Sequence, residues 1–196
     1  MAEFPTKSPG EVVTAADWNQ IEDYVEARGW RPIDSGALSS NTGAIAVPIE
    51  SGLQHIRLTV IGRTTEVGRV GLRVNQDSTS GLHVWGLHGR PASGSDTKSG
   101  DATTSYNVAE WGTVFGNRLT FEMAVSGSQR CPFTATAVRQ SSSDTSRIRW
   151  DSDGYLASPR TPTSVSVLAI GPGNEFIAGS VESGTRWWLE GYRDPT

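Results

Sequence analysis

The chain shows two hydrophobic periodicities in different places. Near the N-terminus, Trp18, Ile21 and Val25 recur at helical spacing, and acidic residues fill the positions between them. Spacings of three and four residues place side chains on one face of a helix. We therefore expect an amphipathic helix from Thr14 to about Ala27, with one apolar stripe.

Both ends of this expected helix carry recognisable signals. Thr14 is a suitable N-cap, and Asp17 three residues later forms an acidic version of the capping box. Gly29 suits the position just beyond a helix, and Pro32 prevents continuation. The pattern divides the chain into an N-terminal extended segment and helix, residues 1–32, and a second region, residues 33–196.

Beyond residue 32, apolar and polar residues alternate, which is the period of a β-strand. Residues 56–60 and 70–74 alternate on either side of a glycine-bounded turn and predict a β-hairpin with its arginines facing water. Further strands are expected at Leu82–Leu87, Leu119–Val125, Phe133–Val138, Arg147–Trp150, Val165–Ile170 and Thr185–Tyr192. The expected fold is all-β: an antiparallel, jelly-roll-like β-sandwich preceded by a short N-terminal helix.

Composition agrees with many short strands joined by turns. The 196 residues are 36% hydrophobic and 19% charged and include 22 glycines. Two polar segments rich in Ser, Thr and Asp, Pro91–Ser105 and Gln140–Ser146, are expected to be exposed loops.

Charge and hydropathy argue against some classes of partner. The formal net charge is −4, and the only lysines are Lys7 and Lys98, so the basic surface typical of nucleic-acid binding is missing. No segment approaches the ~18 apolar residues of a membrane span. The N-terminus lacks the apolar region of a signal peptide. We expect a protein that is made in the cytoplasm and does not insert into a membrane.

Sequence signatures of catalysis are missing. The chain has no nucleophile elbow, no phosphate-binding loop and no zinc-protease helix. Cys131, the single cysteine, is interpreted as a buried thiol. His83 and His88 would lie on opposite faces of a continuous strand, so we interpret them as ordinary surface or loop histidines rather than zinc ligands. We expect no enzyme, no cofactor and no metal.

Two short acidic segments resemble the start of a calcium-binding loop. They are Asp151–Gly154 and Asn75–Asp77. An EF-hand loop also needs a bidentate glutamate near its end, and the first segment is followed instead by Pro159 and Pro162. Both segments are interpreted as polar turns, and a calcium site in β loops remains the alternative.

Tryptophan is the unusual component, with seven residues. Trp187 and Trp188 are adjacent in an expected strand and must point to opposite faces. If only one face of this strand is buried, one of the two rings lies outside the core. That ring is then a candidate for contact with another subunit or with a sugar. Alternatively, the core and local loops cover both rings. The candidates for a glycan or partner contact are Trp85, Trp111, Trp187 and Trp188.

Several motifs resemble those of tailed-bacteriophage tail and fibre proteins. The N-terminal segment of many such proteins is similar to Pro9-Gly10-Glu11-Val12-Val13-Thr14-Ala15-Ala16-Asp17-Trp18-Asn19-Gln20-Ile21-Glu22, with Glu11 in place of the common aspartate. Small β domains of phage minor tail and fibre proteins resemble the segments His55–Arg63, Val70–Asp77, Phe176–Ser180 and Trp187–Tyr192. The middle, Pro91 to Asp144, matches none of their motifs.

The resemblance implies a structural virion protein without catalytic residues, located in the phage particle and commonly oligomeric, with a trimer as the natural analogy. Its partners would be other virion proteins, attached to residues 1–32 with Trp18, Ile21 and Val25 as the anchor. Residues 33–196 would be displayed for binding to host-surface glycans.

Three alternatives to this reading stay open. One is a head fibre or decoration protein without a receptor role, and another is a cellular carbohydrate-binding module. The third is a glycan-degrading enzyme, which needs two carboxylates across a cleft. Spacing singles out no pair among the acids considered, which are Asp101, Glu110, Glu122 and Asp151.

Overall fold

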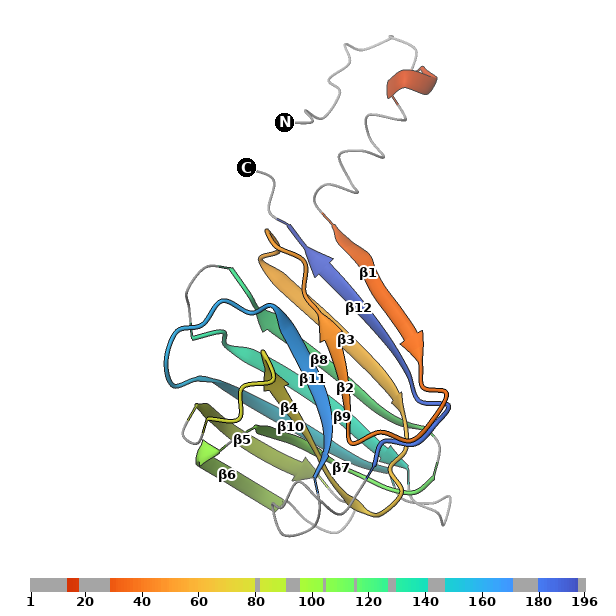
Figure 1. Ribbon diagram of the computed structural model, residues 1–196, viewed down its shortest axis with the longest axis vertical. Coiled ribbons are helices and arrows are strands. Elements are labelled where there is room, and N and C mark those ends of the chain that lie inside the picture. The colour runs from red at the N-terminus through yellow and green to blue at the C-terminus, as the bar shows by residue number, and fades with distance from the viewer. Residues whose placement is uncertain are drawn as a thin grey trace.

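The computed structural model describes residues 14–17, 29–79, 82–90, 96–103, 105–114, 116–126, 130–140, 147–170 and 180–193. These residues form one helical turn and twelve strands (Figure 1). The strands are β1 (Trp30–Ala37), β2 (Ala44–Pro48), β3 (His55–Gly62), β4 (Gly68–Val74), β5 (His83–Arg90), β6 (Asp96–Thr103), β7 (Tyr106–Trp111), β8 (Asn117–Ala124), β9 (Phe133–Gln140), β10 (Arg147–Leu156), β11 (Ser164–Ile170) and β12 (Arg186–Tyr192).

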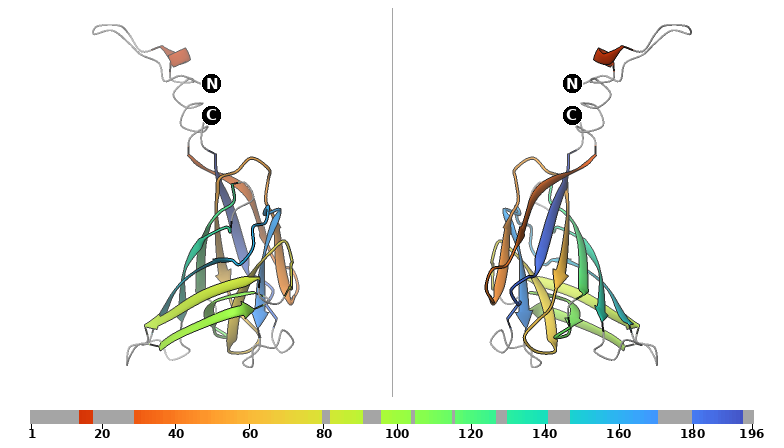
Figure 2. Two further views of the ribbon diagram at one scale, coloured as in Figure 1. Left: turned by 90° about the vertical axis from the view of Figure 1, so that its left-hand side faces the viewer. Right: turned by 90° about the vertical axis from the view of Figure 1, so that its right-hand side faces the viewer.

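Two antiparallel sheets pack face to face. The large sheet has the order β1-β12-β3-β8-β9-β10-β5-β6, and the small sheet has the order β2-β11-β4-β7. Four strands of the large sheet, β1-β12-β3-β8, complete a jelly roll with the small sheet. Two hairpins, β5–β6 and β9–β10, are inserted in this scheme and widen the large sheet (Figure 2). The predicted jelly-roll-like sandwich with a short N-terminal helix is confirmed.

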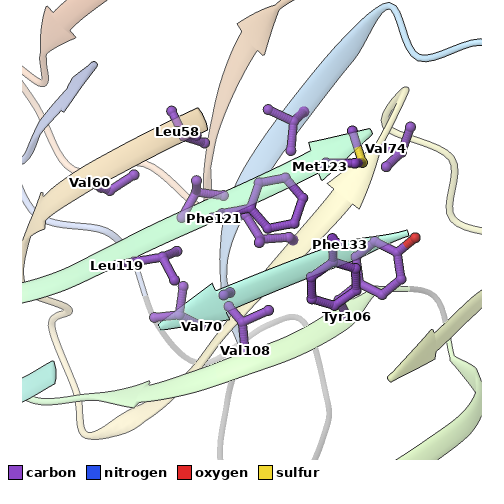
Figure 3. Packing of buried hydrophobic residues seen from close by; sticks show 14 of the residues in the cluster. Leu58, Val60, Val70, Val74, Tyr106, Val108, Leu119, Phe121, Met123 and Phe133 are labelled. Atoms are coloured by element: carbon purple, nitrogen blue, oxygen red, sulfur yellow. The ribbon is translucent and has the colours of Figure 1, made fainter. Parts of the chain in front are cut away.

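Strand β8 illustrates how alternation builds the core. Its inward side chains, Leu119, Phe121 and Met123, are buried, and the residues between them are partly exposed. Each such side chain stabilises the fold by about 1.5–3 kcal/mol when it leaves water. Facing them from the small sheet are Val70, Val74, Tyr106 and Val108 (Figure 3).

The prediction that residues 56–60 and 70–74 form a hairpin is wrong. Both segments are strands, but β3 pairs with β12 and β8 in the large sheet, whereas β4 pairs with β11 and β7 in the small one. The connection between them therefore crosses from one layer to the other. Alternation identifies a strand with one buried face, and both sheets of a sandwich contain such strands, so the pattern does not identify the pairing partner.

Two polar segments are strands rather than loops or turns. Residues 96–103, inside the predicted loop Pro91–Ser105, form β6 and pair with β5. Asp151–Gly154, interpreted as a turn, lies within β10 and pairs with both β5 and β9. Of the second predicted loop, Gln140 ends β9, and the remaining residues are outside the described part of the chain.

The first turn of the predicted helix is within the described residues. The backbone nitrogen and hydroxyl of Thr14 donate to the Asp17 carboxylate, at 2.7 and 2.6 Å, and the Asp17 backbone nitrogen donates to the Thr14 hydroxyl at 3.3 Å. These reciprocal bonds confirm the capping box. The predicted anchor residues, Trp18, Ile21 and Val25, lie outside the described residues.

The chain enters and leaves the sandwich at one end. Trp30, the first residue of β1, is paired with Tyr192, the last residue of β12. At the same end, the Glu50 carboxylate accepts hydrogen bonds from Arg31 at 3.0 Å and Arg193 at 3.4 Å. We call this end, defined by Trp30, Arg31, Glu50, Tyr192 and Arg193, the base. Strand β9 ends and β10 begins at the opposite end (Figure 1).

A glycine in β10 provides a test of the packing. A Cβ at Gly154 would overlap the Val84 carbonyl oxygen and approach the Phe133 ring, whereas a Cβ at Gly43 would meet nothing within 4 Å. We expect Gly154→Ala to lower the free energy of unfolding by about 1–3 kcal/mol, because backbone must shift. Gly43→Ala is the control and should change it by less than about 0.5 kcal/mol. Urea unfolding followed by fluorescence measures both, and equal losses would contradict the packing described.

Candidate functional site

The adjacent tryptophans of β12 lie on opposite faces of the large sheet. Trp187 is partly buried and packs against the core, where its ring lies so close to Gly36 that any side chain there would collide with it. Trp188 points outward and is 40% exposed. The prediction that the two rings diverge is therefore confirmed, and Trp188 is the ring that leaves the core.

The other tryptophans proposed for contact are inside the sandwich. Trp85 is 6% exposed and Trp111 is fully buried. A buried ring does not reach a surface ligand, so these two residues serve the core. Of the four tryptophans considered for a glycan or partner contact, Trp188 alone presents a large exposed surface.

Trp188 lies in a groove on the outer face of the large sheet. The groove has a volume of about 550 Å³, within the range of small-molecule sites. A bulge between Pro32 and Asp34 interrupts the pairing of β1 with β12 beside it, and bulges re-aim side chains in this way. The lining residues are Pro32, Ile33, Asp34, Ser35, Thr59, Trp188, Leu189 and Glu190.

Short polar side chains flank Trp188 on both neighbouring strands. In register, Trp188 lies opposite Ser35 of β1 on one side and Thr59 of β3 on the other. Directly opposed side chains are about 4.5–5.5 Å apart at Cβ, and neither hydroxyl residue is large enough to cover an indole ring. The exposed ring therefore has hydroxyl groups on both sides.

A line of hydroxyl residues continues from the groove across the sheet. Thr59 is opposite Thr120, Thr120 is opposite Thr136, and Thr136 is opposite Asp151. We call Thr59, Thr120 and Thr136 the threonine row. All three are partly exposed, and the Thr136 hydroxyl donates to an Asp151 oxygen at 3.1 Å.

Ion pairs border this line on the side nearer the base. The Arg57 guanidinium lies 2.7 Å from Glu122 and 3.7 Å from Glu190, and 4.3 Å from the centre of the Trp30 ring. At the far end of the line, Arg149 pairs with Asp151 at 2.9 Å. Partly exposed pairs of this kind contribute about 0–1 kcal/mol each. Their main consequence is that acidic groups along the line already have a basic neighbour.

Two of the four acids proposed for glycan hydrolysis have described side chains, and these two do not face each other as a catalytic pair would. Glu122 is bound to Arg57 and Asp151 to Arg149, on strands separated by β9. The side chains of Asp101 and Glu110 are outside the described part of the structure. Glu122 and Asp151 are therefore each paired with an arginine and not with each other.

His83 and Cys131 are both buried. His83 was expected at the surface or in a loop, which is wrong: it is fully buried, and its ring meets Tyr106 edge-on with centroids 4.7 Å apart. The Cys131 thiol donates to the Arg160 carbonyl oxygen at 3.6 Å. Burial raises the pKa of Cys131 to about 11 and also raises that of Tyr106. At neutral pH the thiol is therefore protonated and a poor nucleophile.

Asn75–Asp77 is a turn, as predicted. Asn75 and Gln76 have φ values of 56° and 55°, and the Asp77 backbone nitrogen donates to the Val74 carbonyl at 2.9 Å, which together are typical of a type I′ turn. Thr79 donates from its hydroxyl and its backbone nitrogen to the Asp77 carboxylate. These hydrogen bonds lower the pKa of Asp77.

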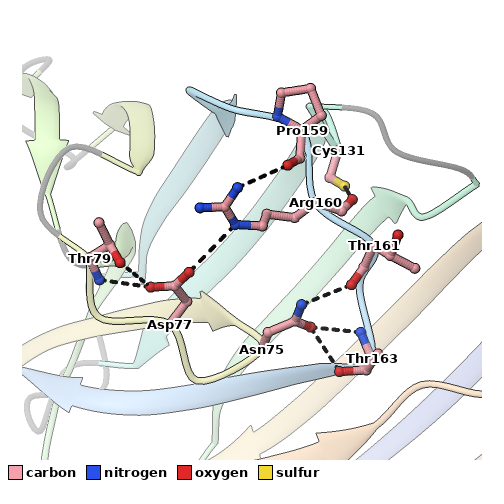
Figure 4. Close-up of polar contacts among 8 residues, drawn as sticks. All are labelled: Asn75, Asp77, Thr79, Cys131, Pro159, Arg160, Thr161 and Thr163. Atoms are coloured by element: carbon pink, nitrogen blue, oxygen red, sulfur yellow. Dashed lines mark hydrogen bonds and ion pairs between the residues drawn. The ribbon is translucent and has the colours of Figure 1, made fainter.

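The polar side chains of this turn attach β4 to the segment before β11 (Figure 4). The Asn75 amide donates to the Thr161 carbonyl at 2.8 Å and accepts from the Thr163 backbone nitrogen at 2.6 Å. Arg160 lies 3.6 Å from Asp77. Within the described ranges, no three His, Cys, Asp or Glu side chains come together to hold a metal. The turn acts as a structural connection.

Sequence reasoning missed the β1 half of the groove. Asp34 and Ser35 were not considered because Pro32 was interpreted only as the end of a helix. An edge strand tolerates proline, and β1 is the edge of the large sheet. The polar residues between Pro32 and Ala37 are the signal that a prediction of an edge strand could have used.

Comparison with known proteins identifies no family. The chain matches no protein-family model, and no curated protein is significantly similar to it. In the part of the chain described, no helix is both long enough and apolar enough to cross a membrane. The site on the large sheet therefore has to be interpreted from its own chemistry.

The burial of Cys131 predicts its reactivity. With a pKa of about 11, about one thiol in a thousand is ionised at pH 8. We expect the folded protein to react with a chromogenic disulfide reagent at least about a hundredfold more slowly than the urea-unfolded chain. Release of the coloured thiolate measures both rates. Rapid, complete reaction of the folded protein would contradict a buried thiol.

Proposed function

We propose that the protein is a structural virion component of a tailed phage, in the tail or a fibre, that carries the sandwich as a displayed domain. Residues 1–32 attach it to another virion protein, and residues 33–196 face outward. The observation that carries this proposal is the base, where β1 begins at Trp30 and β12 ends beside it at Tyr192.

The N-terminal sequence supports an attachment role. Its capping box forms the hydrogen bonds that start a helix. The following sequence continues an apolar stripe through Trp18, Ile21 and Val25. An amphipathic helix needs a surface on which to bury such a stripe. In this proposal that surface belongs to another virion protein, and the resemblance to phage tail and fibre proteins points the same way.

The base also brings the two chain ends of the displayed domain together. Glu50 joins Arg31 at the start of the sandwich to Arg193 at its end. A domain attached at the base has its opposite end farthest from the attachment point, and its sheet faces lie along its sides (Figure 1). The outer face of the large sheet is then available for contact with the host surface.

Several copies in one particle fit the proposed role. A homo-oligomer, with a trimer as the analogy, would present several identical grooves together. Individually weak surface contacts then combine into useful avidity because each additional contact forms within the same particle. A decoration protein without a receptor role would share the attachment and lack the host contact.

The attachment is tested in particles of the phage that encodes the chain. We expect replacement of Trp18, Ile21 and Val25 by serine to reduce the copies per particle at least about tenfold, because the buried apolar stripe is lost. The matched control replaces Glu22, Asp23 and Glu26 by serine and should leave incorporation unchanged. Quantitative immunoblotting of purified particles measures both. Normal incorporation of the first variant would contradict attachment through this segment.

A further inference from the structure

We propose that the groove at Trp188, together with the threonine row, binds an uncharged oligosaccharide that lies across the strands of the large sheet. One pyranose ring stacks on Trp188, and the following sugar units extend over Thr59, Thr120 and Thr136. This inference deepens the proposed display function and rests on it for its biological meaning, although the binding itself is a property of the isolated protein.

The stacking position follows from the exposure of Trp188. The ring is 40% exposed on the outer face of the sheet and has short hydroxyl side chains, Ser35 and Thr59, on both sides. The faces of a pyranose present C–H groups, which pack well on the apolar face of an indole. The groove of about 550 Å³ has room for the sugar beside the ring.

The groove also offers hydrogen-bonding groups at its rim. Asp34 and Glu190 supply carboxylate oxygens, and Ser35 and Thr59 supply hydroxyls that both donate and accept. Sugar hydroxyls likewise donate and accept, so they can match this mixture. Apolar lining from Pro32 and Ile33 completes the usual combination of a flat apolar surface and a few fixed polar groups.

Charge selects a neutral ligand. The groove contains two carboxylates, Asp34 and Glu190, and no basic residue in its lining. The Arg57 guanidinium beside the groove is bound by Glu122 and Glu190. An acidic sugar in the groove would place its negative charge near these carboxylates, and no basic side chain lines the groove to balance it. The groove therefore fits neutral hexoses better than uronic or sialic acids.

The register of the strands sets the direction and length of the ligand. Ser35, Trp188, Thr59, Thr120, Thr136 and Asp151 lie opposite one another on six consecutive strands. With neighbouring strands about 4.8 Å apart, the line spans about 24 Å. The length of a hexose unit is close to one strand spacing, so successive units meet successive hydroxyls. The longer side chains of Arg57, Glu122 and Glu190 border the line on the side nearer the base.

The test uses the full-length protein and soluble oligosaccharides of known structure. Neutral gluco-, galacto- and manno-hexaoses, the corresponding disaccharides and an acidic galacturonate hexaose serve as probes. Titration calorimetry and quenching of tryptophan fluorescence measure binding. We expect at least one neutral hexaose to bind at least about tenfold more tightly than its disaccharide and than the acidic hexaose.

Variants locate the binding on the groove. Trp188→Ala should weaken binding of the neutral hexaose at least about tenfold. Tyr155→Ala is the matched control, because Tyr155 is also 40% exposed but lies outside the groove, and it should leave binding unchanged. Thr120→Val keeps a β-branched side chain and removes the hydroxyl. It should weaken hexaose binding about three- to tenfold and leave disaccharide binding unchanged.

The outcomes separate this inference from the proposed function. Thermal unfolding of Trp188→Ala and Thr120→Val within about 2 °C of the unmodified protein shows that a loss of binding is local. Preference for the acidic hexaose, binding unaffected by Trp188→Ala, or no binding of any neutral hexaose at millimolar concentration would overturn the inference. In each of these cases, normal incorporation of the Trp188→Ala variant into particles would still support the attachment proposal. The attachment depends on residues 1–32 and not on the groove.

Discussion

The pairing of β12 between β1 and β3 is the constraint on which the outer face depends. Leu189 must point into the core, where it is fully buried, so the pleat of the strand sends Trp188 and Glu190 outward. A shift of the register by one residue would place these two side chains in the core and Leu189 in water. The groove is therefore a direct consequence of filling the core, and no separate loop is needed to build it.

The sequence reveals strands well and their partners poorly. Alternation predicted β3, β4 and β8 because each has one buried face, and it predicted that Trp187 and Trp188 diverge. It placed β3 and β4 in one hairpin because nothing local distinguishes the two layers of a sandwich. Pairing of β3 with β12 depends on residues more than one hundred positions apart, which only the closed fold brings together.

Polar strands were the second source of error. The sequences of β6 and of the middle of β10 contain Asp, Ser, Thr and Gly, which local propensity assigns to turns. In the sandwich these segments extend the large sheet beyond the jelly-roll strands, where both form hydrogen-bonded pairs with β5. The inserted strands β9 and β10 also supply Thr136 and Asp151, which continue the line of polar residues beyond Thr120. The part of the site that is hardest to predict is therefore the part on the inserted strands.

The position of the base has a mechanical consequence. Trp30 is the point at which the chain enters the sandwich, and Trp188 is on the neighbouring strand, which is antiparallel to β1. A pull between an attachment before Trp30 and a ligand on Trp188 acts nearly along the strands. The hydrogen bonds between β1 and β12 are perpendicular to that direction and are loaded together in shear rather than one after another. If the domain is attached and loaded as proposed, the edge strand that borders the groove is also the strand that transmits the tension.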